Sequence, residues 1–145
     1  MADLEAAILL AAAAHRGQKD RAGAPYILHP LRLMLRMHTD AERIAAVLHD
    51  VVEDSEWTVD ALRGEGFPDD VVDAVGALTR RAGESYDAAI RRAAAHPIAR
   101  RVKVADLEDN MDVRRIAVVT PADADRLARY HRAWRLLTSP AEPPA

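Results

Sequence analysis

The stretch Ala45–Asp54, AAVLHDVVED, is the part of this 145-residue chain around which the other segments are best understood. Within six residues it carries one imidazole and three carboxylates: His49, Asp50, Glu53 and Asp54. At about 100° per residue, a helix places the apolar residues of this stretch on one side and these polar residues together on the other. The pattern predicts an amphipathic helix with one face that anchors and one that can do chemistry. A polar face in water explains the same pattern.

Composition limits the possible classes of protein. Half of the residues are apolar and 30% are charged, which is typical of one globular domain, and the 4% of aromatic residues means that aliphatic side chains must build the core. The formal net charge of −3 gives no overall cationic field, so nucleic acid is not an expected partner.

The absence of cysteine excludes disulfides and thiolate metal sites, so a metal would need His, Asp, Glu, carbonyl or water ligands. The N-terminus is acidic where a signal peptide would be basic, and no apolar run approaches the roughly 18 residues that span a membrane. We therefore expect a cytoplasmic protein with no membrane partner, and a flexible C-terminal tail over 139–145 (SPAEPPA).

Helical spacing of apolar residues recurs along the whole chain, and no stretch alternates as a strand does. Caps and prolines predict where the helices begin. The expected helices cover 3–16 capped by Asp3, a segment from Pro30, 41–52 capped by Asp40, a short segment capped by Thr58, a segment from Pro68, 85–95 capped by Ser85, 97–111, and a last segment that starts at Thr120-Pro121. The prediction is an all-α bundle of about eight helices in a single domain.

Two further segments offer partners for the His49–Asp50 pair. His29 stands at the entrance of a predicted helix, and Asp106 and Asn110 are one turn apart on another. His29, His49, Asp50 and Asp106 form a two-imidazole, two-carboxylate set, which suits Mn, Fe or Zn with positions left for water. The residues alone leave open whether the segments meet or simply present solvated faces.

Three motifs carry a family resemblance: Tyr26–Pro30 after Gly23-Ala24-Pro25, Leu48–Ser55 (LHDVVEDS), and Val102–Asp106 (VKVAD) with Asn110-Met111. In this order and spacing they resemble the HD-superfamily hydrolase domain of the RelA/SpoT homologues, in particular its small stand-alone members. The resemblance covers about residues 10 to 138. It implies one HD-type metal-dependent phosphohydrolase domain over residues 1–138.

The resemblance also implies roles for individual residues. His29, His49, Asp50 and Asp106 match the family's metal ligands, which usually hold Mn²⁺, although another divalent transition metal is possible. Glu53 and Asp54 match an acidic pair placed beside the attacking water. A role of Glu53 and Asp54 in holding the histidines is the alternative. The implied activity is hydrolysis of the 3′-pyrophosphate of (p)ppGpp, which leaves GDP or GTP and pyrophosphate.

Binding of a polyanionic nucleotide requires cations, and arginine offers paired donors for phosphate. We assign substrate binding to five residues: Lys19, Arg21, Tyr26, Lys103 and Asn110. Arg114 and Arg115 are further candidates, and each cation could equally serve solubility.

The chain departs from the longer RelA/SpoT homologues at two places that contact their substrate. Asp20 replaces a cation, and Asp112-Val113 replaces Arg-Thr. Hydrolysis of another nucleotide or phosphate ester is therefore an alternative function. A noncatalytic domain that senses nucleotides or binds a partner is an alternative of another class. The sequence does not predict the oligomeric state.

Overall fold

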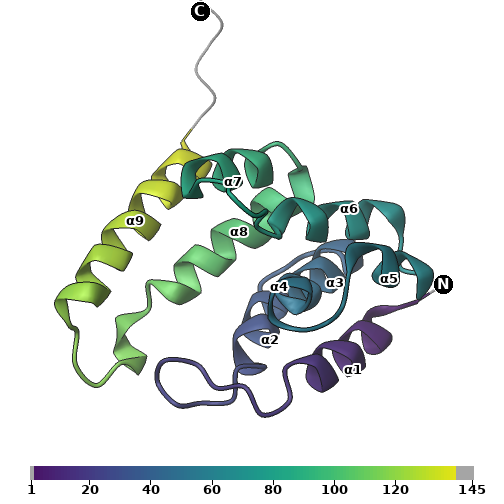
Figure 1. The fold of residues 1–145 in the computed structure, drawn as a ribbon, viewed down its shortest axis with the longest axis horizontal. Helices are drawn as coiled ribbons and strands as arrows, with labels where there is room; N and C mark the ends of the chain where they lie inside the picture. The colour runs from purple at the N-terminus through teal and green to yellow at the C-terminus, as the bar shows by residue number, and fades with distance from the viewer. Residues whose placement is uncertain (1, 140–145) are drawn as a thin grey trace, which may run out of the picture.

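The computed structural model describes residues 2–139, and the secondary structure in this range is helical apart from one isolated bridge between Lys19 and Pro25 (Figure 1). The predicted all-α class is confirmed. The helices are α1 (Leu4–Ala14), α2 (Leu28–Leu35), α3 (Asp40–Leu48), α4 (Val51–Asp54), α5 (Val59–Gly64), α6 (Asp69–Leu78), α7 (Tyr86–Ala94), α8 (Pro97–Asn110), the short 3₁₀ helix η1 (Val113–Arg115) and α9 (Pro121–Thr138).

Helices α3 and α8 are the two central elements of the bundle. Helix α3 contacts α1, α2, α6 and α8, while α8 contacts α2, α3, α6, α7 and α9. In Figure 1, α8 crosses the molecule between α9 and the group formed by α2, α3 and α6. This arrangement brings α2, α3 and α8 together, and these three helices contain or adjoin all four predicted metal ligands.

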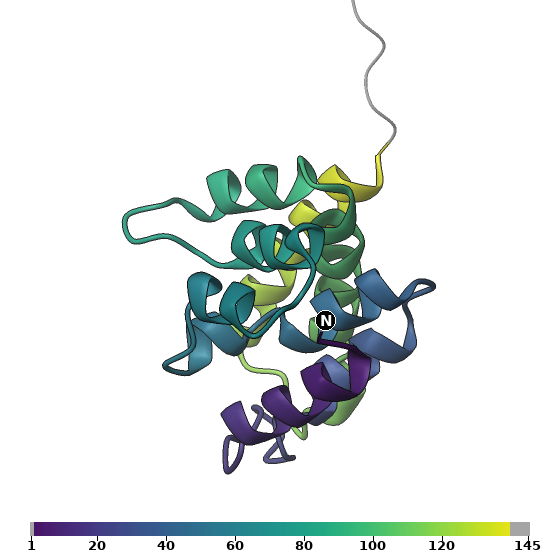
Figure 2. The same cartoon turned by 90° about the vertical axis from the view of Figure 1, so that its right-hand side faces the viewer.

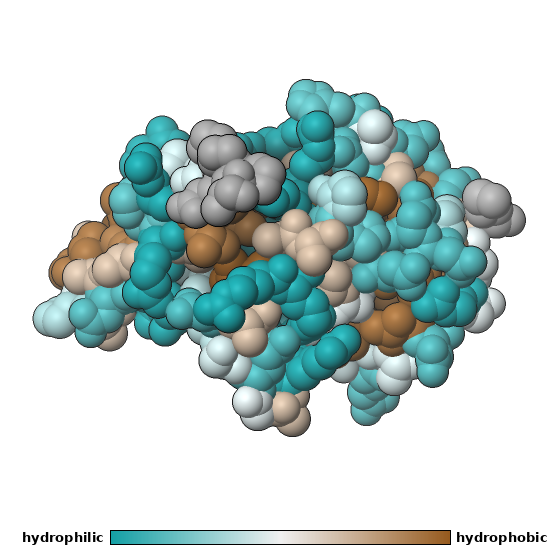
Figure 3. Space-filling view, turned by 90° about the horizontal axis from the view of Figure 1, so that it is seen from above, coloured by the Kyte–Doolittle hydropathy of each residue, from teal (hydrophilic) through white to brown (hydrophobic). Residues whose placement is uncertain are grey.

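Aliphatic residues build the core, as the low aromatic content predicts. Four consecutive residues of α3, Ala45 to Leu48, are fully buried, and so is Val51 of α4. A smaller cluster, centred on Leu107 and Leu137, joins α7, α8 and α9. Seen from above, the surface shows apolar residues in separate patches divided by polar ones (Figure 3).

The predicted helix over 41–52 is wrong in its continuity, because it breaks at His49–Asp50 into α3 and α4. The amide N–H of His49 donates to the Ala46 carbonyl, three residues back, at 3.4 Å, and Asp50 leaves the helical region with φ −105° and ψ 1°. No Gly or Pro marks this position in the sequence. Contacts made by the side chains of His49 and Asp50, described below, hold the break in place.

The predicted N-caps of four helices are confirmed by side-chain hydrogen bonds; they are Asp3, Thr58, Ser85 and Thr120. The predicted cap Asp40 is wrong. Thr39 caps α3 instead, in a capping box with Glu42, whose side chain reaches back to the cap backbone. The side chains of Thr39 and Glu42 together accept hydrogen bonds from two backbone N–H groups, whereas a cap formed by Asp40 would accept from one.

Two features bear on the limits of the domain. No helix among residues 2–139 combines the length and apolar character needed to cross a bilayer. The predicted tail over 139–145 lies, from residue 140 onward, outside the described residues.

In Figure 2, the loop between α6 and α7 projects from the bundle.

Candidate metal centre

His49 lies at the break between α3 and α4, with only 2% of its surface exposed. Its Nδ1 lies 2.7 Å from the carbonyl oxygen of Ala46. A carbonyl can only accept, so Nδ1 carries a proton and donates it, and Nε2 is the nitrogen left to bind a metal. That Nε2 faces Asp50 Oδ2 at 2.9 Å.

His29 of α2 and Asp106 of α8 complete a compact group with this pair. His29 Nε2 lies 2.9 Å from Asp106 Oδ1, and His49 Nε2 lies 3.6 Å from the same oxygen. Ligand atoms of His29, His49 and Asp50 all lie within 4.8 Å of one another. We call His29, His49, Asp50 and Asp106 the His/Asp cluster. Segments far apart in the sequence therefore bring His29, His49 and Asp50 within reach of one ion, and Asp106 contacts both histidines.

The geometry of the His/Asp cluster fits a metal ion. His49 Nε2 is buried without a hydrogen-bond partner, although two carboxylate oxygens face it. A lone pair that faces anionic oxygens is repelled unless a cation or a proton lies between them. Two ligand atoms that each lie ~2.1 Å from one ion, at 90–110°, are about 3.0–3.4 Å apart. The three distances of 2.9, 2.9 and 3.6 Å between these atoms lie close to this range.

Electrostatics in the cluster favour positively charged histidines and negatively charged aspartates. Burial acts to lower the pKa of both histidines, but the neighbouring Asp50, Asp106 and Asp109 carboxylates outweigh it and raise the pKa of His29 and His49 above the ordinary value. Burial acts to raise the pKa of Asp106, but Lys103 and the two histidines outweigh it and lower that pKa. Without a metal the cluster therefore holds protons, and a metal must displace them.

Three residues predicted to bind substrate make contact with the carboxylates of the cluster. Lys103 Nζ donates to Asp106 Oδ2 at 2.9 Å, and Asn110 Nδ2 donates to Asp106 Oδ1 at 3.1 Å. The Tyr26 hydroxyl donates to Asp50 Oδ2. Burial, followed by the charge of Asp50, raises the pKa of Tyr26, which keeps its hydroxyl protonated and able to donate.

The carboxylate of Asp109, which the sequence analysis did not single out, also contacts the cluster. Its Oδ2 lies 2.6 Å from His29 Nδ1, and Arg32 donates to both of its oxygens, at 2.8 and 2.9 Å. Burial acts to raise the pKa of Asp109, but His29 and Arg32 outweigh it and lower that pKa. Asp109 follows Asp106 by three residues on α8, and this i,i+3 spacing was the available signal.

A cavity of about 230 Å³ opens beside His29 and extends toward the loop between α1 and α2. Four residues predicted to bind substrate line it: Lys19, Arg21, Tyr26 and Asn110. Arg115 of η1 lines it as well, and its guanidinium pairs with Asp20 Oδ2 at 3.3 Å. Arg21 pairs with Asp123, whose other carboxylate oxygen caps α9. Arg21 and Arg115 are therefore held at the cavity by carboxylate partners.

The acidic pair that follows the cluster makes two different contacts. Glu53 Oε1 accepts the amide N–H of Arg80 at 2.6 Å, which ties α4 to the loop before α7. Asp54 has a raised pKa, first because of burial and then because of the charge of Asp50. The carbonyl oxygen of Asp54 accepts a hydrogen bond from Gln18 Nε2 at 2.9 Å.

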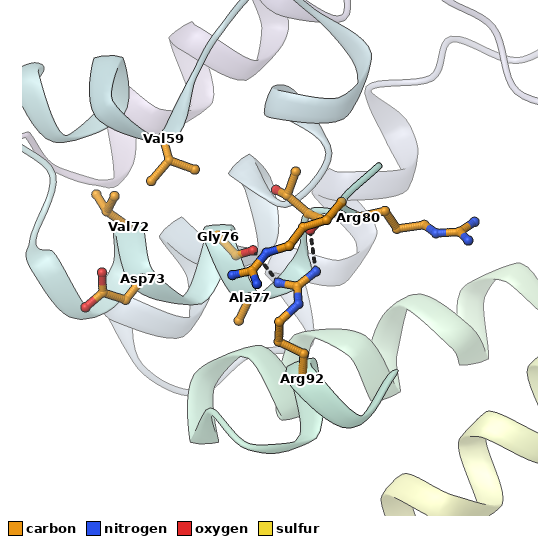
Figure 4. A pocket seen from close by; sticks show the side chains of 9 residues that line it. Val59, Val72, Asp73, Gly76, Ala77, Arg80 and Arg92 are labelled. Atoms are coloured by element: carbon orange, nitrogen blue, oxygen red, sulfur yellow. Dashed lines mark hydrogen bonds between the residues drawn. The ribbon is translucent and has the colours of Figure 1, made fainter. Parts of the chain in front are cut away.

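A second cavity, of about 470 Å³, lies between α5, α6 and the loop before α7 (Figure 4). Three arginines line it, and one of them, Arg92, donates to the carbonyl oxygens of Gly76 and Thr79, at 2.8 and 2.6 Å, and pairs with Glu84. Because these partners occupy the guanidinium, Arg92 serves to hold α6 and α7 together.

With this geometry established, comparison with known proteins identifies the family. Residues 7–134 match the family described as the HD domain, so the chain belongs to the HD domain family. A probable GTP pyrophosphokinase of Mycobacterium leprae is 37% identical over 128 residues, which is 79% of this chain and 16% of that protein. A guanosine-3′,5′-bis(diphosphate) 3′-pyrophosphohydrolase of Haemophilus influenzae is 37% identical over 78 residues, or 50% of this chain and 12% of that protein.

The similarity extends to a solved structure. A protein described as a metazoan orthologue of SpoT that hydrolyses ppGpp has a TM-score of 0.76 and 24% identity, with 94% of this chain and 85% of that chain covered. This match supports the HD-domain fold. The predicted resemblance to the hydrolase domain of RelA/SpoT homologues is confirmed, and the chain spans a small part of the longer curated relatives.

Proposed function

We propose that this chain is a metal-dependent phosphohydrolase that removes the 3′-pyrophosphate of (p)ppGpp, giving GDP or GTP and pyrophosphate. The observation that carries the proposal is the His/Asp cluster, with its unpartnered His49 Nε2, beside a cavity lined by fixed cations. The proposed ligands are His29, His49, Asp50 and Asp106. A mixed imidazole and carboxylate set suits Mn²⁺, and also accommodates iron or zinc.

A divalent ion bound there would supply a nucleophile at neutral pH and a countercharge for the phosphoryl oxygens. In the reaction, the oxygen of water joins the phosphorus nearest the ribose, the bond from that phosphorus to the 3′ oxygen breaks, and the 3′ oxygen gains a proton. No protein nucleophile is required.

The acidic pair after the cluster would move the proton of the attacking water. A carboxylate with a raised pKa is a better base at neutral pH than an ordinary one, and Asp54 has a raised pKa. The Arg80 amide fixes the orientation of Glu53. General base catalysis of this kind is worth about 10²–10⁴ in rate.

The cavity beside His29 would bind the nucleotide. Lys19, Arg21 and Arg115 supply positive charge, and arginine can form paired hydrogen bonds to phosphate or stack on a base. Asp20 holds Arg115 in place, so the acid at this position maintains a cation in the cavity wall. Tyr26 and Asn110 line the cavity and also contact the cluster, so they connect the two halves of the proposed site.

A second candidate is hydrolysis of another nucleotide or phosphate ester. It is favoured by the cavity wall itself, in which Asp20 and Asp112 stand among the cations. Two acids in the wall change the hydrogen-bonding pattern that a base would meet, while the His/Asp cluster would act on any phosphate ester placed beside it.

Incubation of the purified protein with Mn²⁺ and guanosine tetraphosphate tests the proposal, with GDP and pyrophosphate measured separately. Equal amounts of the two products, lost on His49→Ala, would support it. Bound Mn²⁺ with turnover of another nucleotide in a panel would support the second candidate. Bound nucleotide without turnover of any panel member would indicate a noncatalytic sensing domain.

A further inference from the structure

Asp109 of α8 makes several charged contacts beside the proposed metal centre. Only 10% of its side chain is exposed, yet its carboxylate contacts His29, Arg32 and Arg115. We propose that Asp109 is a positioning residue that fixes His29 as a metal ligand. This inference rests on the proposed function, because it concerns the same site.

The hydrogen bond between Asp109 and His29 determines which nitrogen of His29 is free. An ionised carboxylate can only accept, so the 2.6 Å contact places the proton on His29 Nδ1. Nε2 faces Asp106 Oδ1 at 2.9 Å, so without a metal this nitrogen also donates to a carboxylate, and it is the nitrogen that a metal at the cluster would take. Asp109 thus keeps a proton on His29 Nδ1, as the Ala46 carbonyl does on His49 Nδ1, and leaves Nε2 of each ring for the metal.

The two histidines nevertheless differ in their partners. His49 is held by a backbone carbonyl, which is neutral, whereas His29 is held by a carboxylate, which is charged. A carboxylate partner makes a stronger hydrogen bond and increases the basicity of the other ring nitrogen. His29 should therefore be the stronger donor of the two to a divalent ion, provided that Asp109 stays ionised and oriented.

The surroundings of Asp109 keep it oriented. Arg32, from the same helix as His29, forms a two-pronged contact with both carboxylate oxygens at 2.8 and 2.9 Å. Arg115 donates to the Asp109 carbonyl oxygen at 2.8 Å and approaches Oδ2 at 3.4 Å. With both oxygens occupied, the carboxylate cannot rotate away from His29 without breaking several charged contacts.

A purely structural role is the competing explanation, because Asp109 also joins α8 to α2. Asp109→Asn separates the two: the amide keeps the size and one oxygen acceptor but removes the charge. The matched control is Glu108→Gln, the neighbouring residue of α8, which pairs with Arg36 away from the His/Asp cluster. The readouts are Mn²⁺ affinity by calorimetry and Tm of the metal-free protein.

We expect Asp109→Asn to weaken Mn²⁺ binding about 10–100-fold, the usual effect of removing a partner of a metal-ligating histidine, with Glu108→Gln unchanged. A lower Tm with wild-type Mn²⁺ affinity in the folded variant would overturn the inference. A wild-type protein that binds neither Mn²⁺ nor Zn²⁺ would instead overturn the metal site and the proposed function with it.

A second measurement needs no variant and therefore no assumption about folding. In the metal-free wild-type protein, ¹⁵N spectra of the histidine rings report which nitrogen is protonated. We expect the His29 signals to show a proton on Nδ1 that remains when diamagnetic Zn²⁺ shifts the Nε2 signal. A proton found on Nε2 alone, or a Zn²⁺ shift at Nδ1, would contradict the proposed role of Asp109.

Discussion

Replacing Lys103 with methionine should destabilise the metal-free protein by an amount that Mn²⁺ partly restores. Lys103 Nζ lies 2.9 Å from Asp106 Oδ2, and the side chains are only 23% and 8% exposed. Removing one partner of a buried ion pair costs about 3–5 kcal/mol, because the other charge stays buried without compensation. Asp106 keeps contacts from His29 and Asn110, so the lower end of this range applies.

The expected shift in Tm follows from chain length. At about 2.1 cal/mol/K of unfolding entropy per residue, a 145-residue chain loses about 10 °C in Tm for a destabilisation of about 3 kcal/mol. A divalent ion compensates the charge of Asp106 only in the folded state, so saturating Mn²⁺ should raise the Tm of Lys103→Met more than that of the wild type.

Thermal unfolding with and without Mn²⁺ measures both quantities. Arg36→Met is the matched control, since its ion pair with Glu108 is 47% and 34% exposed and such pairs contribute about 0–1 kcal/mol. A Lys103→Met variant as stable as this control would refute the buried-charge reasoning. Equal Mn²⁺-induced increases in Tm for the variant and the wild type would refute the compensation by metal.

Three further predictions concern the proposed metal site. His49→Ala should abolish Mn²⁺ binding in calorimetry while far-UV circular dichroism remains helical. Glu53→Gln should keep Mn²⁺ but lose about 10²–10⁴ in rate; loss of the metal would instead show that Glu53 holds the ligands. The raised pKa values of His29 and His49 contribute stability that is fully present below about pH 6.5, the unfolded pKa, and is lost as pH rises through the pKa values of the folded state. The Tm of the metal-free protein should therefore fall over that pH interval. The Mn²⁺ affinity should rise over the same interval, because fewer protons compete with the metal.

The sequence predicted the fold through local signals. The caps Asp3, Thr58, Ser85 and Thr120 and the spacing of apolar residues placed the helices within a few residues, because a cap and the first turn it serves are adjacent in the chain. The break at His49–Asp50 had no such signal. One of the contacts at this break comes from the Tyr26 hydroxyl, 24 residues away, which donates to Asp50.

The candidate site was predictable in its residue types and not in its connections. The motifs that contain His29, His49 and Asp106 predicted them as metal ligands, and the fold brings these residues together. The pairing of Arg115 with Asp20 joins residues 95 positions apart, and no periodicity in the sequence encodes such a contact. The sequence therefore indicated only that Asp20 replaces a cation, whereas in the structure Asp20 holds the cation Arg115 in place.

The contact between Arg21 and Asp123 has a consequence for anyone who wishes to redesign the specificity of this protein. Asp123 closes the first turn of α9 through its bonds with Thr120 and grips Arg21 with the same carboxyl group. A substitution at Asp123 would affect helix α9 and the Arg21 side chain at the wall of the proposed substrate cavity at once. Lys19 and Ala22 line the same cavity, and both are exposed. Substitutions at these two positions should therefore change the cavity wall without disturbing the fold.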